Sequence, residues 1–381
     1  MKIAILGTAY PYRGGIAAFN ERLAKELIAE GHEIRIHTFK LQYPNFLFPG
    51  KTQFSSDKKP QNIKIERRIN SVNPINWITT GLSLRKRNYD VVIIPFWLPF
   101  MGASLGTISR ILKSEKTQLL CIAHNIIPHE LRLGDKMLTR YFIKRIDGFL
   151  VMTQKVLDDL NVFDKSSPKV LTPHPIYDNF GEIEPREKAI ESLKLNQDYR
   201  YILFFGLIRD YKGLDLLLEA FSTNEIREKN IKLIIAGEYY SNQAHYKKLI
   251  EKYNLEQDII QVEQFIPDSE VHLYFNACDL VVQPYKSATQ SGVTQIAYHF
   301  NKPMIVTDVG GLKEMCPDGK VGYVVSPHAD EIKKAILKFF NETNINEMIE
   351  NINQIKKQYS WFIFTKKLLA LTNSKKNNIP S

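Results

Sequence analysis

The sequence is poor in cysteine, with three residues in a chain of 381. These residues, Cys121, Cys278 and Cys316, are widely separated and lie in apolar surroundings, which argues against a disulfide framework and a clustered zinc site and favours a reducing compartment. The first seven residues, MKIAILG, lack the length and cleavage pattern of a secretory signal and predict a buried strand instead. Together these features predict a cytoplasmic protein.

Long hydrophobic runs are also scarce. The one uncharged run of membrane-spanning length, residues 91–109, contains Pro95, Pro99 and several Gly, Ser and Thr residues. Because proline and glycine interrupt helices, this run predicts a strand, a loop and a helix start rather than a spanning helix. The alternative is a loop that dips into a membrane.

Several signature motifs are missing. No G-x-G-x-x-G follows the first strand, which disfavours a nicotinamide cofactor. Neither a Ser-His-acid set nor a metal-ligand cluster is evident, so hydrolysis by a triad and a metal centre are both unsupported. The sequence also has no recognition motif for nucleic acid, which makes a nucleic-acid partner unexpected.

Negative charge is scarce in the first half of the chain. Residues 1–180 carry 26 Lys plus Arg and 15 Asp plus Glu, or +11, whereas residues 181–381 carry 25 and 26, or −1. Much of the excess lies in residues 51–68 and 85–116. This distribution suits an anionic membrane surface or a phosphorylated acceptor, and the alternative is an ordinary solvated surface.

The chain is too long for one hydrophobic core, and its pattern predicts two α/β domains. Apolar strands alternate with helical patterns in two series, which predicts two doubly wound parallel sheets that are covered on both faces. In the first series the expected strands are 1–6, 33–39, 63–67, 91–94, 118–123, 148–152 and 169–171. In the second series they are 201–206, 232–237, 258–262, 280–284, 303–308 and 322–325.

A polar, proline-containing stretch at residues 173–200 separates the two series and predicts a linker with an entry helix. We therefore expect one domain at residues 1–175 and a second at 176–358. The amphipathic segment 359–371 is long enough to cross back onto the first domain, and it is followed by a polar tail.

The loop before residue 293 is rich in hydroxyl groups and ends on a glycine. Thr289, Gln290, Ser291 and Gly292 directly precede a helical pattern that starts with Val293. A helix start offers free N–H groups and a positive dipole end, so this loop is a candidate phosphate site. An ordinary helix start is the alternative.

Three further strand ends carry candidate functional residues. Gly14 and Gly15 would bring backbone amides to the carboxyl edge of the first sheet, although a simple tight turn gives the same pattern. Arg209 and Lys212 follow the first strand of the second series and could clamp a diphosphate, or lie in a solvated loop. His124 could point into a cleft and exchange a proton or bind a hydroxyl, but a structural role is equally compatible with this position.

Taken together, the motifs resemble the family 4 glycosyltransferases with the GT-B fold. They are GG after the first strand, HN-x-x-PHE from residue 124, G-x-I-R-x-Y-K-G from residue 206, and SATQSGV-x-Q-x-A-Y-x-x-x-KP-x-I-x-TDVGG from residue 287. The resemblance implies two Rossmann-like domains that face a central cleft. It also implies transfer of a sugar from a nucleotide diphosphate donor with retention of anomeric configuration, with neither a metal nor a resident cofactor.

The resemblance also implies roles for the candidate residues. Arg209 and Lys212 would hold the donor diphosphate, and His124 would face the donor sugar. The remaining donor-binding residues would be Gly14, Gly15, Thr289, Gln290, Ser291, Gly292, Val293 and Gln295. Phe265 and Ile266 would lie against the nucleobase.

Two positions depart from the family pattern. The arginine that commonly follows the glycine matched by Gly206 is replaced by Leu207, so its role passes to Arg209. The usual pair of glutamates, eight residues apart, falls on Ala288 and Ile296, or on Ser287 and Gln295 after a shift of one residue. Gln295 could still bind a ribose hydroxyl while remaining neutral.

The sequence thus predicts a cytoplasmic retaining glycosyltransferase that extends a glycan or a lipid-linked oligosaccharide in cell-surface polysaccharide synthesis. Its basic first domain would lie near the membrane face. The missing glutamates keep open a non-catalytic protein that binds a nucleotide sugar. A sugar-nucleotide epimerase of the same fold is a further alternative.

Overall fold

The computed structural model describes residues 1–372 except 45–47, 49, 129–131 and 290. It contains two parallel sheets, and this confirms the predicted fold class of two Rossmann-like α/β domains. Within the described residues, the helices are all too short or too polar to cross a bilayer.

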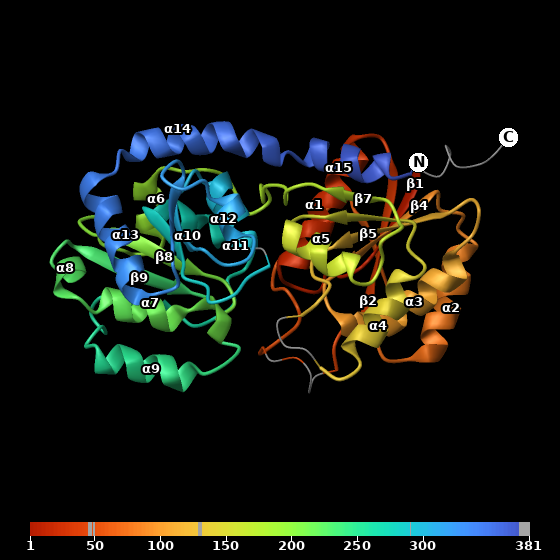
Figure 1. Ribbon diagram of the computed structural model, residues 1–381, viewed down its shortest axis with the longest axis horizontal. Coiled ribbons are helices and arrows are strands. Elements are labelled where there is room, and N and C mark those ends of the chain that lie inside the picture. The colour runs from red at the N-terminus through yellow and green to blue at the C-terminus, as the bar shows by residue number, and fades with distance from the viewer. Residues whose placement is uncertain (45–47, 49, 129–131, 290, 373–381) are drawn as a thin grey trace. The chain divides into compact units, whose positions relative to one another are not determined.

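The first sheet has seven strands in the order β3-β2-β1-β4-β5-β6-β7, so the strand order reverses between β1 and β4 (Figure 1). The strands are β1 (Lys2–Leu6), β2 (Glu33–Leu41), β3 (Lys64–Asn70), β4 (Val91–Phe96), β5 (Gln118–Ala123), β6 (Gly148–Val151) and β7 (Lys169–Leu171). The central strands are almost wholly apolar because both of their faces are covered.

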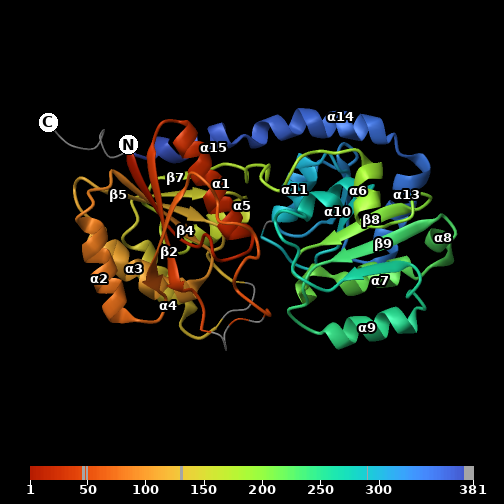
Figure 2. The same cartoon turned by 180° about the vertical axis from the view of Figure 1, so that it is seen from behind.

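Helices cover both faces of this sheet. They are α1 (Gly15–Ala29), α2 (Pro74–Arg85), α3 (Gly102–Leu112), α4 (Asp135–Ile143), α5 (Gln154–Asn161) and α15 (Trp361–Ala370), with a 3₁₀ turn at Pro99–Met101. Apolar side chains of α2 to α5 share one core with the sheet, whereas α1 and α15 pack against each other. Both views show α2, α3 and α4 side by side (Figures 1 and 2).

The second sheet has six strands in the order β10-β9-β8-β11-β12-β13, and its order reverses between β8 and β11. The strands are β8 (Arg200–Phe205), β9 (Ile231–Ala236), β10 (Ile259–Val262), β11 (Leu280–Gln283), β12 (Met304–Thr307) and β13 (Gly322–Val325). The helices are α6 (Arg186–Ser192), α7 (Leu214–Phe221), α8 (Asn224–Arg227), α9 (Gln243–Lys252), α10 (Val271–Ala277), α11 (Gly292–His299), α12 (Leu312–Met315), α13 (Ala329–Glu342) and α14 (Ile345–Ile355), with 3₁₀ turns at Asp210–Lys212 and Lys356–Tyr359.

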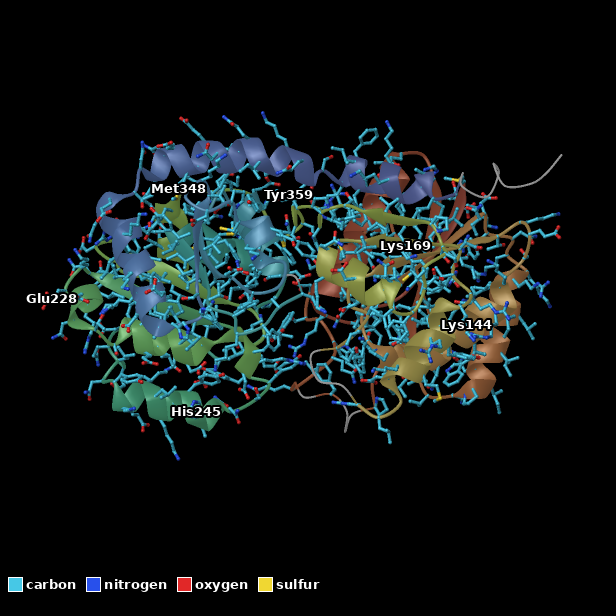
Figure 3. The ribbon with its side chains drawn as sticks, viewed as in Figure 1. Lys144, Lys169, Glu228, His245, Met348 and Tyr359 are labelled. Atoms are coloured by element: carbon cyan, nitrogen blue, oxygen red, sulfur yellow. The ribbon has the colours of Figure 1, made fainter. Side chains whose placement is uncertain are left out.

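Contacts divide the chain into two compact units. The first unit comprises residues 1–48, 52–175 and the segment from Tyr359 onward, and the second comprises 49–51 and 176–358. Figure 3 labels Met348 on α14, in the second unit, and Tyr359, where the returning segment begins. In the first unit this segment packs Trp361 and Phe364 around Phe19 of α1, with ring centroids 5.1 and 5.7 Å away.

Most strands begin and end within a few residues of their predicted limits, but the long helices α2 and α14 lie outside the predicted pattern. Helix α2 exposes several apolar side chains and buries Gly81 and Thr80, so it lacks a clear apolar stripe toward the core. Helix α14 follows α13 after two residues, and Asn344 caps its first turn. Met348 and Ile352, four residues apart, are its buried positions, so the two helices meet at a short capped junction.

Candidate functional site

The loop after β8 is fixed by a glycine that no other residue can replace. Gly213 has a φ of 67°, and a Cβ there would lie 2.0 Å from the carbonyl oxygen of Pro284. The close approach holds the 3₁₀ turn at Asp210–Lys212 against the segment that follows β11. Two carboxyl-edge loops of the sheet, on either side of its reversal point, are therefore in contact.

Lys212 is buried in this contact, with 8% of its surface exposed. Its Nζ lies 5.5 Å from the centroid of the Tyr285 ring. A Cβ at Gly206 would lie 3.1 Å from the same Nζ and 3.8 Å from Val293 Cγ2. Burial, together with the neighbouring charge of Arg209, lowers the pKa of Lys212 to about 8. The ammonium group thus sits between the β8 loop and the start of α11, and among the described residues no carboxylate pairs with it.

Arg209 precedes the turn and is half-buried. Its guanidinium carbon lies 5.2 Å from the centroid of the Tyr240 ring, a cation–π contact that restricts the side chain. With Lys212, it gives the loop two positive charges three residues apart. Such a pair suits a diphosphate better than a single phosphate.

The hydroxyl-rich loop ends at an uncapped helix. Ser291 is the N-cap residue of α11, yet its side chain makes no capping hydrogen bond. Its Oγ lies 3.2 Å from the hydroxyl of Tyr285 instead. The first turn of α11 contains no acidic residue. Among the described residues, the positive end of this helix is therefore left open to an anion.

Neighbouring backbone holds this loop in place. Gly310 has a φ of 52°, and a Cβ there would lie 1.6 Å from the carbonyl oxygen of Ala288. Thr307 donates a 2.6 Å hydrogen bond to the carbonyl oxygen of Tyr285. A Cβ at Gly292 would lie 3.0 Å from the ring of Tyr177. The loop is thus shaped by residues that follow β12 and by the linker. Thr289 and Val293 are both buried beside it, and Gln290 lies outside the described residues.

Gln295 is fully buried on α11, and neither atom of its amide group has a hydrogen-bond partner among the described residues. A buried amide without partners is costly, and such a group in a native protein usually serves a ligand or an ordered water. Gln283 adds a second buried amide nitrogen that finds no partner in the part of the chain that the structure describes, while its Oε1 accepts a hydrogen bond from Thr294. Buried polar groups are therefore concentrated beneath the α11 loop.

The candidates of the first unit lie at the carboxyl ends of β1 and β5. Gly14, with a φ of 108°, is the N-cap of α1, and no side chain caps this helix either. Gly15 is its first residue. His124 is buried, and its ring meets Phe19 edge-on at 4.8 Å. Burial, and then the nearby His174, lower the pKa of His124 to about 3. This imidazole is therefore neutral at physiological pH and suited to hydrogen bonding.

The structure thus brings together Arg209, Lys212, Ser291, Gly292 and Val293 in the second unit, with Gln295 on the same helix. Phe265 and Ile266 follow the outer strand β10, where Ile266 is buried and Phe265 partly exposed.

Two tyrosines beside these residues, Tyr285 and Tyr177, were not predicted from the sequence. Tyr285 could have been found, because it follows a buried strand as Arg209 does. Tyr177 could not, because its contact with α11 joins segments more than 100 residues apart. Among the described residues, no three His, Cys, Asp or Glu side chains are arranged to hold a metal ion.

Comparison with known proteins identifies similar chains. Residues 185–358, just under half of the chain, match the family model described as glycosyl transferases group 1. An uncharacterized glycosyltransferase of Methanocaldococcus jannaschii is 24% identical over 374 residues, covering 95% of each chain. The lipopolysaccharide 1,2-N-acetylglucosaminetransferase of Salmonella typhimurium is 25% identical over 189 residues, covering 46% of this chain and 49% of that protein.

The fold also matches solved structures. Anabaena HepE, solved in complex with UDP and glucose, superposes with a TM-score of 0.75 at 14% identity, over 98% of this chain and all of that one. At this identity the likeness shows the fold alone. The family model and the two relatives support glycosyltransferase activity.

Proposed function

We propose that this chain, with its two Rossmann-like units, is a group 1 glycosyltransferase that transfers a sugar from a nucleotide diphosphate donor to a glycan or lipid-linked acceptor, with retention of anomeric configuration. The observation that carries the proposal is the position of the Lys212 ammonium group between the β8 loop and the uncapped start of α11. Both features favour an anion, and the second unit offers them within one small region.

The reaction needs charge stabilisation on the leaving diphosphate more than it needs a strong base. Arg209 would contact the diphosphate through paired N–H donors, and Lys212 would act as a point charge. Burial lowers the pKa of Lys212 to about 8, and a bound diphosphate would raise this pKa and so stabilise the charged ammonium group. Since two cations supply this stabilisation, the proposed reaction is independent of a metal ion.

Gln295 would take the place of a carboxylate that binds the donor. A ribose hydroxyl could satisfy its Oε1, and a phosphate or hydroxyl oxygen its Nε2. The neutral amide would add no negative charge close to the diphosphate. Ser291, Gly292 and Val293 would present backbone N–H groups to the phosphates, and Phe265 and Ile266 would lie against the base.

In the first unit, Gly14 and Gly15 at the start of α1 would contribute backbone to the binding of the donor phosphates. His124, held neutral by burial, would hydrogen-bond a sugar hydroxyl. The basic character of residues 1–180 suits an anionic membrane surface, and the Salmonella relative, by its name, acts on lipopolysaccharide. The proposal therefore includes a role in cell-surface polysaccharide synthesis at the cytoplasmic side of a membrane.

A screen of the donor base comes first. UDP, GDP and ADP sugars are compared by thermal shift, because a ligand that binds only the native state raises its stability with concentration. We expect a UDP sugar to give the largest shift, in line with the UDP bound to the Anabaena structure. Turnover is then followed as release of the nucleotide diphosphate with candidate acceptors, with and without a chelator.

Arg209→Ala tests the chemistry. This variant should lose about 100-fold or more in turnover, in the range seen when one preorganised donor is removed from a transition state, while its unfolding free energy changes little. Arg227→Ala is the matched control, because Arg227 pairs with Asp258 through its Nε at 2.8 Å and belongs to α8. Near-normal transfer by Arg209→Ala would remove the assignment.

A non-catalytic protein that binds a nucleotide sugar is the second candidate, favoured by the absence of the glutamate pair at Ala288 and Ile296. It predicts a clear thermal shift with a nucleotide sugar and no diphosphate release with any acceptor. Release that depends on an acceptor would exclude it.

A further inference from the structure

The first unit contains a hollow of about 450 Å³ that is remote in sequence from the candidate donor site. It lies between strands β2 and β3, at the edge of the sheet, and helix α2. The residues that line it all have polar or charged side chains and include Lys40, Glu66, Arg67, Arg68, Thr80 and Ser83. Three of these residues are cationic against one carboxylate, so the lining carries a net charge of +2.

Glu66 organises the positive charge but does not neutralise it. Its carboxylate accepts hydrogen bonds from Arg35 at 3.1 Å, from Arg68 at 2.6 Å and from Arg87 at 2.8 and 3.0 Å. Burial acts to raise the pKa of Glu66, but the hydrogen bonds from these arginines outweigh it and lower the pKa to about 2. The carboxylate is therefore ionised throughout the physiological pH range. It holds three guanidinium groups in place, and their combined positive charge exceeds its single negative charge.

Donors remain available for a further anion. Arg68 reaches the hydroxyl of Ser83 at 3.4 Å, on the α2 side of the hollow. The amino group of Lys40 is exposed and has no hydrogen-bond or ion-pair partner in the part of the chain that the structure describes. A tetrahedral oxyanion between Lys40 and Arg68 would meet a cation on both sides.

The adjacent face of α2 is apolar and exposed. Ile75, Ile78 and Leu82 have 74%, 48% and 50% of their surface exposed. Their spacing of three and four residues places them on one side of the helix, next to the face that lines the hollow. Arg85 and Lys86, both exposed, continue this side at the helix end. Helix α2 packs against α3 and β3, and Figures 1 and 2 show it at the end of the row that it forms with α3 and α4.

We propose that this surface binds an anionic lipid, with the lipid phosphate in the hollow between β3 and α2 and with Ile75, Ile78 and Leu82 in the lipid interface. A membrane presents lipid phosphates next to hydrocarbon. This surface places cationic side chains next to apolar ones, so its chemistry is complementary to that of a membrane. A soluble phosphate ester would use the hollow but leave the three apolar side chains in water. The inference deepens the membrane part of the proposed function and rests on it for the nature of the partner.

The test is sedimentation of the full chain with vesicles of neutral phosphatidylcholine, alone or mixed with anionic phosphatidylglycerol. We expect binding only to the anionic vesicles, weakening as salt rises. Lys40→Glu should reduce the partition coefficient about tenfold, because each basic residue near an anionic surface contributes appreciably to binding. The double variant Ile75→Ser with Ile78→Ser should reduce it by a similar factor without any change of charge.

Matched controls separate the surface from general charge and hydrophobicity. Lys165→Glu changes the same charge in the same unit but outside the basic stretches 51–68 and 85–116, and Val162→Ser removes an apolar side chain that is 69% exposed. Both should bind vesicles within about twofold of wild type. Equal losses in the controls, binding to neutral vesicles alone, or no vesicle binding at all would overturn the proposal. A Lys40-dependent thermal shift with inorganic phosphate but no vesicle binding would do so too, by identifying a soluble anion as the ligand.

A failure of the lipid-binding proposal can be distinguished from a failure of the proposed glycosyltransferase function. The Lys40 and Ile75/Ile78 variants should keep the wild-type thermal shift with a nucleotide sugar, because their residues belong to the first unit, whereas the loops with Arg209 and Lys212 belong to the second. Vesicle binding without sugar transfer would overturn the enzyme assignment and keep the lipid surface. Sugar transfer to a soluble acceptor without vesicle binding would do the reverse.

Discussion

Replacing Lys212 with methionine should make the empty protein more stable and the donor site inactive. The pKa of Lys212 is lowered from 10.5 to about 8 by burial and by Arg209. At roughly 1.36 kcal/mol per pH unit, this lowering of the pKa corresponds to about 3 kcal/mol, which is the cost of keeping the group charged in the fold at pH 7. Methionine keeps the unbranched stem and removes the charge, so the unfolding free energy at pH 7 should rise by up to about 3 kcal/mol.

The direction of the expected change in stability can be checked through its dependence on pH. Because the folded state holds the Lys212 proton less tightly than the unfolded chain, the wild-type protein gains stability as pH rises from about 8 to 10.5. The advantage of Lys212→Met should therefore be full below pH 8 and disappear above pH 10.5. Urea unfolding at pH 7 and pH 10.5 measures it.

A ligand measurement completes the test. Lys212→Met should lose the thermal shift with a nucleotide diphosphate, whereas Lys286→Met should keep it, because Lys286 is 43% exposed and paired with Asp215. The Lys286 change should alter stability by less than about 1 kcal/mol. A destabilised Lys212→Met protein, or one that still responds to the nucleotide diphosphate, would refute the reasoning.

Three further predictions concern buried groups and close contacts. Gln295→Leu removes an amide that has no partners among the described residues. It should therefore raise the unfolding free energy by about 1 kcal/mol while increasing the KM for the donor. A lower stability of the variant would mean that the amide is hydrogen-bonded in the empty protein. Gly310→Ala should lower the unfolding free energy by at least about 2 kcal/mol in urea titrations, because its Cβ would overlap the Ala288 carbonyl at a φ of 52°, and a neutral effect would contradict the loop geometry. Burial raises the pKa of Glu21 to about 6 against the opposing hydrogen bond from the Tyr10 amide, so its contribution to stability is present below pH 4.5 and is lost as pH rises through 6. Glu21→Gln keeps that hydrogen bond and should therefore add up to about 2 kcal/mol at pH 8 and little at pH 4, as thermal unfolding at the two pH values would reveal.

The alternation of strands and helices could be predicted from the amino-acid sequence alone. Buried parallel strands such as β4 and β8 are continuous apolar runs, and glycine or proline marks many of their ends, so a local pattern locates them. Local sequence context was also enough to propose Arg209, Lys212 and Ser291 as candidate site residues, because each follows a buried strand or precedes a helix. Helix α2 escaped prediction because several of its apolar side chains are exposed, while its core side combines Leu84 with Gly81 and Thr80.

The surroundings of these residues, by contrast, depend on tertiary packing. Lys212 has a depressed pKa because Gly213 lets the β8 loop approach Pro284 and brings the lysine beside Tyr285, a contact across more than 70 residues. The amide of Gln295 has no partner among the described residues because of the side chains that pack around α11. The spacing of residues in the sequence does not specify these neighbours. The burial of a side chain and the charges around it depend on many residues that are distant in the sequence. Strand and helix patterns depend only on residues within a few positions.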